Sequence, residues 1–190
     1  ERDRPSLSLP FAQPFTSAMT VFGWNGARQN PINQREQDVN VLQAAILNNG
    51  LLLRDNVRLG LTSAFTQLAL QAEDPTTLVK QTYLRILGRT PDKVELNMFV
   101  ELIRDGFSDR RISVSPAELA LAANQKYQLP RDLVSWSNHN SMKANEIKLV
   151  LRKAVYRGES PTPQLNTAWR EQMEDMVWVL FNSPEFIYIR

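Results

Sequence analysis

The sequence contains no cysteine, and His139 is the single histidine among its 190 residues. Without cysteine the chain cannot form a disulfide, a thiolate zinc site, an iron–sulfur cluster or a covalent c-type haem attachment. It also has no glycine-rich phosphate-binding loop and no run of about 18 apolar residues that would span a membrane. These absences exclude most functions that a motif would reveal, and we expect no metal and no cofactor.

Charges of the two signs are nearly balanced, with 22 Lys and Arg against 20 Asp and Glu and a net charge of +2. They are interspersed along both halves of the chain, unlike the basic footprint of a nucleic-acid-binding protein. Hydrophobic residues make up 43% of the chain, which is enough for a sizeable core. This length is typical of one domain, or of one domain with a small appendage.

The first residues, ERDRPSLSLP, have neither an initiator methionine nor the apolar segment of a signal peptide. We therefore expect the chain to be a C-terminal piece of a longer protein, with any export signal upstream. Residues 1–33 contain four prolines, which interrupt regular structure, together with many apolar residues. This composition predicts an extended lead-in packed on the body, and residues 34–190 are predicted to form a single helical domain.

Hydrophobic periodicity predicts a mainly α fold, an irregular helical domain with a central antiparallel helical hairpin. Asp74 followed by Pro75 is a strong helix start, and Gly88 ends that helix. Thr90-Pro91 repeats the start signal, and Gly106 ends the second helix. The apolar stripe of the first helix is predicted at Val79, Tyr83, Ile86 and Leu87, and that of the second at Val94, Met98 and Leu102 with the neighbouring Phe99 and Ile103.

Other helices are predicted on both sides of this hairpin. The predicted ranges are 35–49, 51–58, 62–71, 115–125 and 142–157, followed by a last helix from Asn166 to Pro184. Gly50 is expected to cap the first of these in a left-handed conformation, and Val39, Leu42, Ala45 and Ile46 are expected to face inward. The last helix has a strong stripe that includes Trp169 and Met173, with Glu171, Glu174 and Asp175 on a solvated face. Residues 186–189 form an apolar C-terminal tail, expected to be extended and packed.

Four polar residues are weak catalytic candidates, namely Arg35, Glu36, Asp38 and His139. Acidic residues at the start of a helix are explained by the helix dipole alone, and His139 has no second histidine with which to share a metal. The simpler interpretation is a helix N-terminus and a loop histidine bonded to backbone. Trp136, in the polar loop of residues 135–141, is a weak candidate for stacking on a ligand.

Several stretches carry a family resemblance, and the most specific is the closing phrase, residues 169–186. The others are FGWNGARQNP (22–31), LQAAILNNG (42–50), TYLRILGRTP (82–91), PRDLVSWSNHNS (130–141) and PTPQL (161–165). In order and wording they resemble the C-terminal domain of unknown function of large exported planctomycete proteins. The matching residues of the closing phrase are Trp178, Leu180, Asn182, Ser183, Glu185 and Phe186. A structural role is expected for Asn182 and Ser183, which can satisfy the carbonyls at a helix end while Pro184 blocks its continuation.

The resemblance implies a periplasmic or cell-surface protein whose upstream sequence often holds cytochrome-c-like or carbohydrate-binding-like domains. It supplies no catalytic residues. Our first hypothesis is a non-catalytic helical module that docks on an upstream domain of the same polypeptide or on a cell-envelope partner. The alternatives are part of an enzyme acting on envelope polysaccharide or in haem-linked redox chemistry, and a glycan-binding module using Trp136. Nucleic acid is the least expected partner, because the net charge is small.

Overall fold

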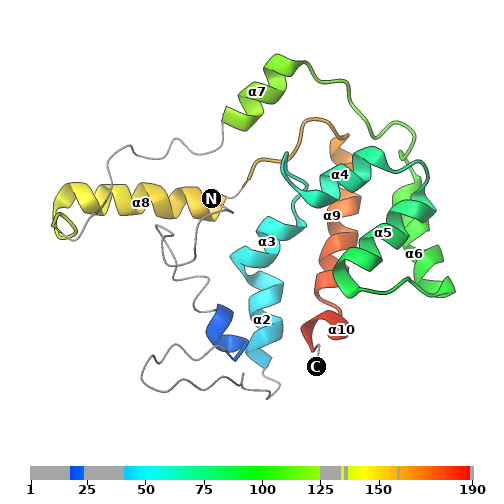
Figure 1. Cartoon of the computed structure of the whole chain (residues 1–190), viewed down its shortest axis with the longest axis horizontal. Coiled ribbons are helices and arrows are strands. Elements are labelled where there is room, and N and C mark those ends of the chain that lie inside the picture. Colours follow the sequence, from blue (N-terminus) through cyan, green and yellow to red (C-terminus); the bar gives the residue numbers. More distant parts are fainter. Residues whose placement is uncertain (1–17, 24–40, 125–133, 135–136, 158, 189–190) are drawn as a thin grey trace. The chain divides into compact units, whose positions relative to one another are not determined.

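The computed structural model describes residues 18–23, 41–124, 134, 137–157 and 159–188, and it is mainly helical, as the periodicity predicts (Figure 1). Extended residues in these ranges pair only as isolated bridges, Gly60 with Pro161 and Arg111 with Leu165. The helices are α2 (Val41–Asn49), α3 (Leu51–Val57), α4 (Ala64–Gln71), α5 (Pro75–Leu87), α6 (Lys93–Arg104), α7 (Pro116–Asn124), α8 (Met142–Arg157), α9 (Thr167–Phe181) and α10 (Pro184–Ile187).

The chain divides into two compact units. The larger comprises Leu47–Lys126 and Glu159–Arg190, and the smaller comprises Glu1–Ile46 and Tyr127–Gly158. The predicted boundary between residues 33 and 34 lies outside the described residues. No helix in the described ranges is long and apolar enough to cross a membrane.

The core of the larger unit is built on α9, which contacts α3, α5 and α6. Trp169, Met173, Met176, Val177 and Leu180 are buried along one face of α9, and this confirms the predicted stripe. Asn166 caps the helix by accepting hydrogen bonds from the backbone N–H groups of Ala168 and Trp169, as predicted. A Trp side chain at this depth requires a partner for its N–H group, and Trp169 Nε1 donates to the carbonyl of Ile103 at 2.9 Å.

Helices α5 and α6 form the predicted hairpin. Asp74 caps α5 at the N–H of Thr77, and Gly88 ends it with a φ of 71°, a left-handed conformation that glycine adopts without strain. The start of α6 differs from the prediction at Thr90-Pro91, because Asp92 is the N-cap. Asp92 and Glu95 form a reciprocal capping box, and this pairing fixes the first turn two residues later than the proline signal indicates.

The predicted inner stripe of α6 is partly wrong. Phe99 and Ile103 are buried, but Val94 is 77% exposed, Met98 54% and Leu102 37%. Two apolar rows run along this helix, one through Phe99 and Ile103 and one through Val94, Met98 and Leu102. The row with Phe99 packs inward, and the Phe99 ring lies edge-on to the Tyr83 ring at 5.7 Å between centroids. The other row therefore faces solvent.

Backbone hydrogen bonds join the segment before α9 to two parts of the larger unit that are distant in sequence, near Leu59 and near Arg110. The N–H of Thr162 donates to the carbonyl of Leu59, and the N–H of Ile112 donates to the carbonyl of Gln164. The N–H of Asn166 also donates to the carbonyl of Arg110, at 2.7 Å. These bonds give the stretch 161–165 a structural role, because they set where α9 begins.

The end of α9 follows the predicted chemistry. Asn182 Nδ2 donates to the carbonyl of Trp178, and Ser183 Oγ donates to the carbonyl of Leu180. Ser183 then caps α10, so the apolar tail is helical over Pro184–Ile187 and the expected extended conformation is wrong there. The serine cap and the proline at the first helical position favour this short helix. Phe186 packs edge-on against Phe181 at 4.9 Å, as expected of a tail that folds back on the core.

Three further details differ from the sequence predictions. Residues 18–21 of the lead-in are helical, since no proline interrupts this short stretch. Gly50 has a φ of −79° and begins α3, so it is not a left-handed cap. On α2, Leu42 and Ala45 are exposed, contrary to the predicted inward face, and Val39 lies outside the described residues.

In the smaller unit, α8 forms as predicted over residues 142–157. Ser141 Oγ accepts the N–H of Ala144 at its start, and Ala144 and Ile147 are buried. Val150 is exposed, and Lys143, Lys148, Arg152 and Lys153 form a solvated basic surface on the same helix.

Candidate functional site

The residues predicted from sequence as a candidate site are mostly not described by the structure. Arg35, Glu36, Asp38 and Trp136 lie outside the described residues, so their convergence with His139 stays a prediction. His139 lies half-buried in a turn, and its backbone carbonyl accepts a hydrogen bond from Lys148 Nζ at 2.9 Å. Within the described ranges, no group of three or more His, Cys, Asp or Glu could hold a metal ion.

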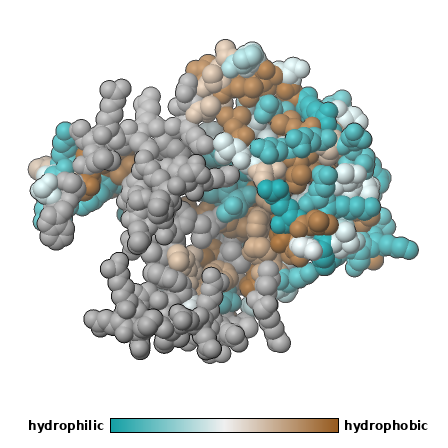
Figure 2. Space-filling view, viewed as in Figure 1, coloured by the Kyte–Doolittle hydropathy of each residue, from teal (hydrophilic) through white to brown (hydrophobic). Residues whose placement is uncertain are grey.

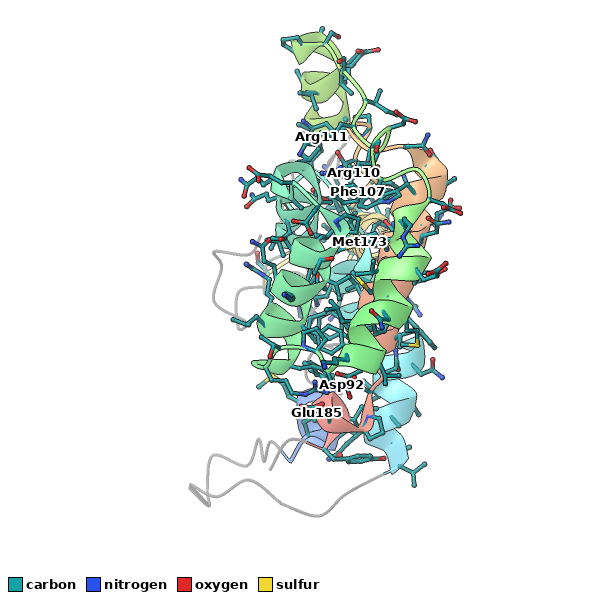
Figure 3. All side chains as sticks on the ribbon, turned by 90° about the vertical axis from the view of Figure 1, so that its right-hand side faces the viewer. Asp92, Phe107, Arg110, Arg111, Met173 and Glu185 are labelled. Carbon is teal, nitrogen blue, oxygen red and sulfur yellow. The ribbon has the colours of Figure 1, made fainter. Side chains whose placement is uncertain are left out.

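Among the described residues of the larger unit, three polar arrangements and one solvent-facing apolar row are candidates for a functional site. Two of the polar arrangements lie at opposite ends of the helical layer, with Met173 between them (Figure 3). Arg110 and Arg111 are at one end, and Asp92 and Glu185 mark the other. The third arrangement is a cavity between α3 and α9.

Arg89 joins the α5–α6 turn to α10 through two carboxylates. Its Nη1 and Nη2 each donate to one oxygen of Glu95 at 2.8 Å, while Nε and Nη2 donate to Glu185 at 2.7 to 3.0 Å. The planar guanidinium suits such two-sided bidentate pairing. Arg89 also stands over the Tyr83 ring, 5.4 Å from its centroid. Glu185, from the closing NSPEF phrase, therefore has a structural role of tying α10 to the hairpin.

The same contacts shift the ionisation of the residues involved. Hydrogen bonds from Arg89 and from the N–H of Asp92 lower the pKa of Glu95 from 4.5 to about 2. Arg89 also lowers the pKa of Glu185, and the two carboxylates raise the pKa of Arg89. Burial, with a smaller contribution from Glu95, raises the pKa of Tyr83 to about 12. At neutral pH the network is therefore fully charged beside a neutral phenol.

Acid should weaken the larger unit through Glu95. Its folded pKa lies below the unfolded one, so its stabilisation is complete above about pH 4.5 and is lost as pH falls towards 2. We expect a loss of about 1 to 2 kcal/mol, because solvent screens charges that are partly exposed. Urea unfolding at pH 7 and pH 3 measures it. Glu95→Gln should reduce this pH dependence, whereas the exposed Glu73→Gln should leave it unchanged; equal pH dependence in both variants would contradict the assignment.

At the opposite end, Arg110 is a buried cation held by backbone carbonyls. Its guanidinium donates to the carbonyls of Ala69 at 2.8 Å and Phe107 at 2.6 Å, and also to that of Ala72. It stacks on the Phe107 ring at 3.6 Å from the centroid. Burial, and less strongly Arg111, lowers the pKa of Arg110 to about 10, so it stays charged at neutral pH. The arginine thus satisfies the carbonyl end of α4, a structural role.

The cavity between α3 and α9 has a volume of about 340 Å³ and lies wholly within the larger unit. It is lined by Asn48, Gly50, Leu53, Arg54, Val57, Arg58, Glu174 and Trp178. Glu174 accepts the N–H of Leu59 at 2.8 Å and lies 3.5 Å from Arg170 Nε, so it is not the solvated acid that the sequence pattern predicts. Trp178, in contrast, is 41% exposed on the cavity wall.

The exposed apolar row of α6 is the fourth feature. Val94, Met98 and Leu102 are four residues apart, so they lie along one face of the helix. Glu101 and Asp105 are exposed beside this row, and Glu101 forms a 3.5 Å ion pair with Arg104. Apolar residues also reach the surface among hydrophilic ones elsewhere on the larger unit (Figure 2).

Sequence reasoning missed both Arg110 and the cavity. Nothing in the periodicity marks a buried arginine, because its carbonyl partners on α4 are about 40 residues away. The available signal for the cavity was the i, i+4 spacing of Arg54 and Arg58 on a short helix, opposite a tryptophan at the edge of the α9 stripe. Comparison with protein-family models, curated proteins and solved structures finds no match for the chain.

Proposed function

We propose that this chain is a non-catalytic helical docking module, and that the apolar row of α6 is its recognition surface. The observation that carries the proposal is the exposure of Val94, Met98 and Leu102 on a helix whose opposite face is fixed in the core. A row of three large apolar side chains in water is unfavourable by about 25 cal/mol for each Å² of apolar area left uncovered. A partner that covers the row recovers this free energy.

The surroundings of the row favour one type of partner, an amphipathic helix with basic residues beside its apolar stripe. Glu101 and Asp105 flank the row, and the carbonyl end of α6 adds the negative end of the helix dipole. Arg104 offsets only part of this charge, because its own ion pair is with Glu101. An amphipathic helix binds an apolar surface through anchors spaced at i, i+3, i+4 and i+7, and the i, i+4 spacing of the α6 row suits such a helix.

Such a helix belongs, in this proposal, to an upstream domain of the same polypeptide or to a cell-envelope protein. The resemblance of residues 169–186 and of the other quoted stretches to exported planctomycete proteins supports a periplasmic or cell-surface location. The proposed docking function requires neither a bound cofactor nor a reaction on a polysaccharide.

Site-specific photo-cross-linking in the native cells tests the docking surface. A photoreactive phenylalanine analogue at Met98 should give one discrete adduct, and mapping of the adduct should place the cross-link on an amphipathic basic helix. The matched control is the same group at Asn97, one position away on the same exposed helix but outside the row. Equal labelling from both positions, or an adduct that maps to an acidic or non-helical segment, would overturn the proposal.

A further inference from the structure

The cavity between α3 and α9 combines three kinds of group that together recognise a particular ligand. Arg54 lies in α3 and Arg58 is the residue that ends this helix, and both line the cavity. Trp178 contributes an exposed indole from α9, and the carboxylate of Glu174 lies one turn before it. Leu53 and Val57 supply apolar lining between them. A volume of about 340 Å³ is within the range of small-molecule sites and holds one or two sugar rings.

The positions of the polar groups are fixed by bonds to the fold. Arg58 Nη1 donates to the carbonyl of Glu159 at 3.0 Å, and Arg54 pairs with Asp55 at 3.1 Å. Glu174 is held by the N–H of Leu59. A guanidinium carries five N–H donors, so it can serve several acceptors at once. These anchored side chains therefore need little reordering to receive a ligand, and this lowers the entropy cost of binding.

The charges of the cavity favour an anion. Three arginines, Arg54, Arg58 and Arg170, outnumber the two carboxylates paired with them, Asp55 and Glu174. Guanidinium groups bind carboxylate and phosphate oxygens in pairs of hydrogen bonds. The indole of Trp178 offers a flat apolar face for a ring, and the Glu174 carboxylate can accept a hydroxyl hydrogen bond.

We propose that this cavity binds a saccharide unit that carries an anionic group. The ring lies on Trp178, the anionic group faces Arg54 and Arg58, and Glu174 accepts a ring hydroxyl. This site is independent of the α6 row, so neither proposal requires the other. It also differs from the glycan site suggested at Trp136, which belongs to the smaller unit.

Ligand-observed NMR on the whole chain tests the site with three probes. These are trigalacturonate, whose anion is a carboxylate, glucose 6-phosphate, whose anion is a phosphate, and neutral maltotriose. We expect one of the two anionic probes to bind, and its identity then gives the chemistry of the anion. Trp178→Ala should weaken that binding about tenfold, because the sugar ring loses the apolar face of the indole on which it lies.

Arg58→Gln should also weaken binding by about fivefold and should reduce its salt dependence. Arg85→Gln, at an exposed position of α5, removes the same charge away from the cavity and should change nothing. Thermal unfolding midpoints of all three variants should stay close to that of the wild type. The proposal is overturned if neither anionic probe binds at about 10 mM, if maltotriose binds equally well, or if Trp178→Ala binds like wild type.

Discussion

Replacing Trp169 with alanine should lower the free energy of unfolding of the larger unit by about 3 to 5 kcal/mol. The side chain is buried against α6 and lies edge-on to Phe107 at 6.0 Å. Its removal opens a large void and leaves the carbonyl of Ile103 without the indole N–H. Domains of this size are stable by only about 5 to 15 kcal/mol, so the variant should be close to unfolding at 37 °C. Urea denaturation followed by circular dichroism measures the loss.

The matched control is a second tryptophan on the same helix. Trp178 is 41% exposed, and Trp178→Ala should cost less than about 1 kcal/mol. Trp169→Phe should fall between them, because it keeps most of the ring and loses the hydrogen bond. If Trp169→Ala and Trp178→Ala were equally stable, the assignment of Trp169 to the centre of the core would be wrong.

Arg110→Met should give the second largest loss, about 2 to 4 kcal/mol. Methionine fills much of the volume above Phe107, but the carbonyl of Ala69 then loses the guanidinium donor, and the carbonyl of Phe107 keeps only the long 3.5 Å bond from the backbone N–H of residue 110. Arg110→Lys should recover little, because a compact ammonium cannot span three carbonyls as a planar guanidinium does. Chemical denaturation of both variants measures the effect.

The neighbouring arginine is the control for this loss. Arg111 is exposed and its Nη2 donates to the carbonyl of Ala72 at 2.9 Å, so Arg111→Met should cost less than about 1 kcal/mol. Buried charges can sometimes be replaced by apolar residues without cost. If Arg110→Met were as stable as the wild type, Arg110 would be one of these replaceable buried charges. That result would contradict its role in satisfying the carbonyl groups at the end of α4.

The parts of the fold that were predictable from sequence are those set by local chemistry. Asp74, Asn166 and Ser183 cap helices by accepting hydrogen bonds from backbone N–H groups within three residues, and such local capping can be predicted from sequence. The α9 stripe was readable for the same reason, because it is long, regular and rich in large side chains.

The parts that were not predictable depend on partners that are distant in sequence. Glu174 looked like a solvated acid until Leu59, 115 residues away, supplied its N–H. On α6 the sequence offered two apolar rows, and only the packing of Phe99 on Tyr83 decides between them. The candidate site of Arg35, Glu36, Asp38, Trp136 and His139 was a set of residue types without a spacing that brings them together, and it stays a prediction.

The docking account separates the stability of the larger unit from its ability to bind a partner. Met98→Lys places a charge in the exposed row of α6, and Asn97→Lys places the same charge beside the row. With the photoreactive group at Val94 in native cells, Asn97→Lys should still give the cross-link to the basic helix and Met98→Lys should lose it, in the same polypeptide or in an envelope protein. Both variants should unfold at the same urea concentration as the wild type. An undiminished cross-link in Met98→Lys, at undiminished stability, would contradict the claim that this row is a recognition surface.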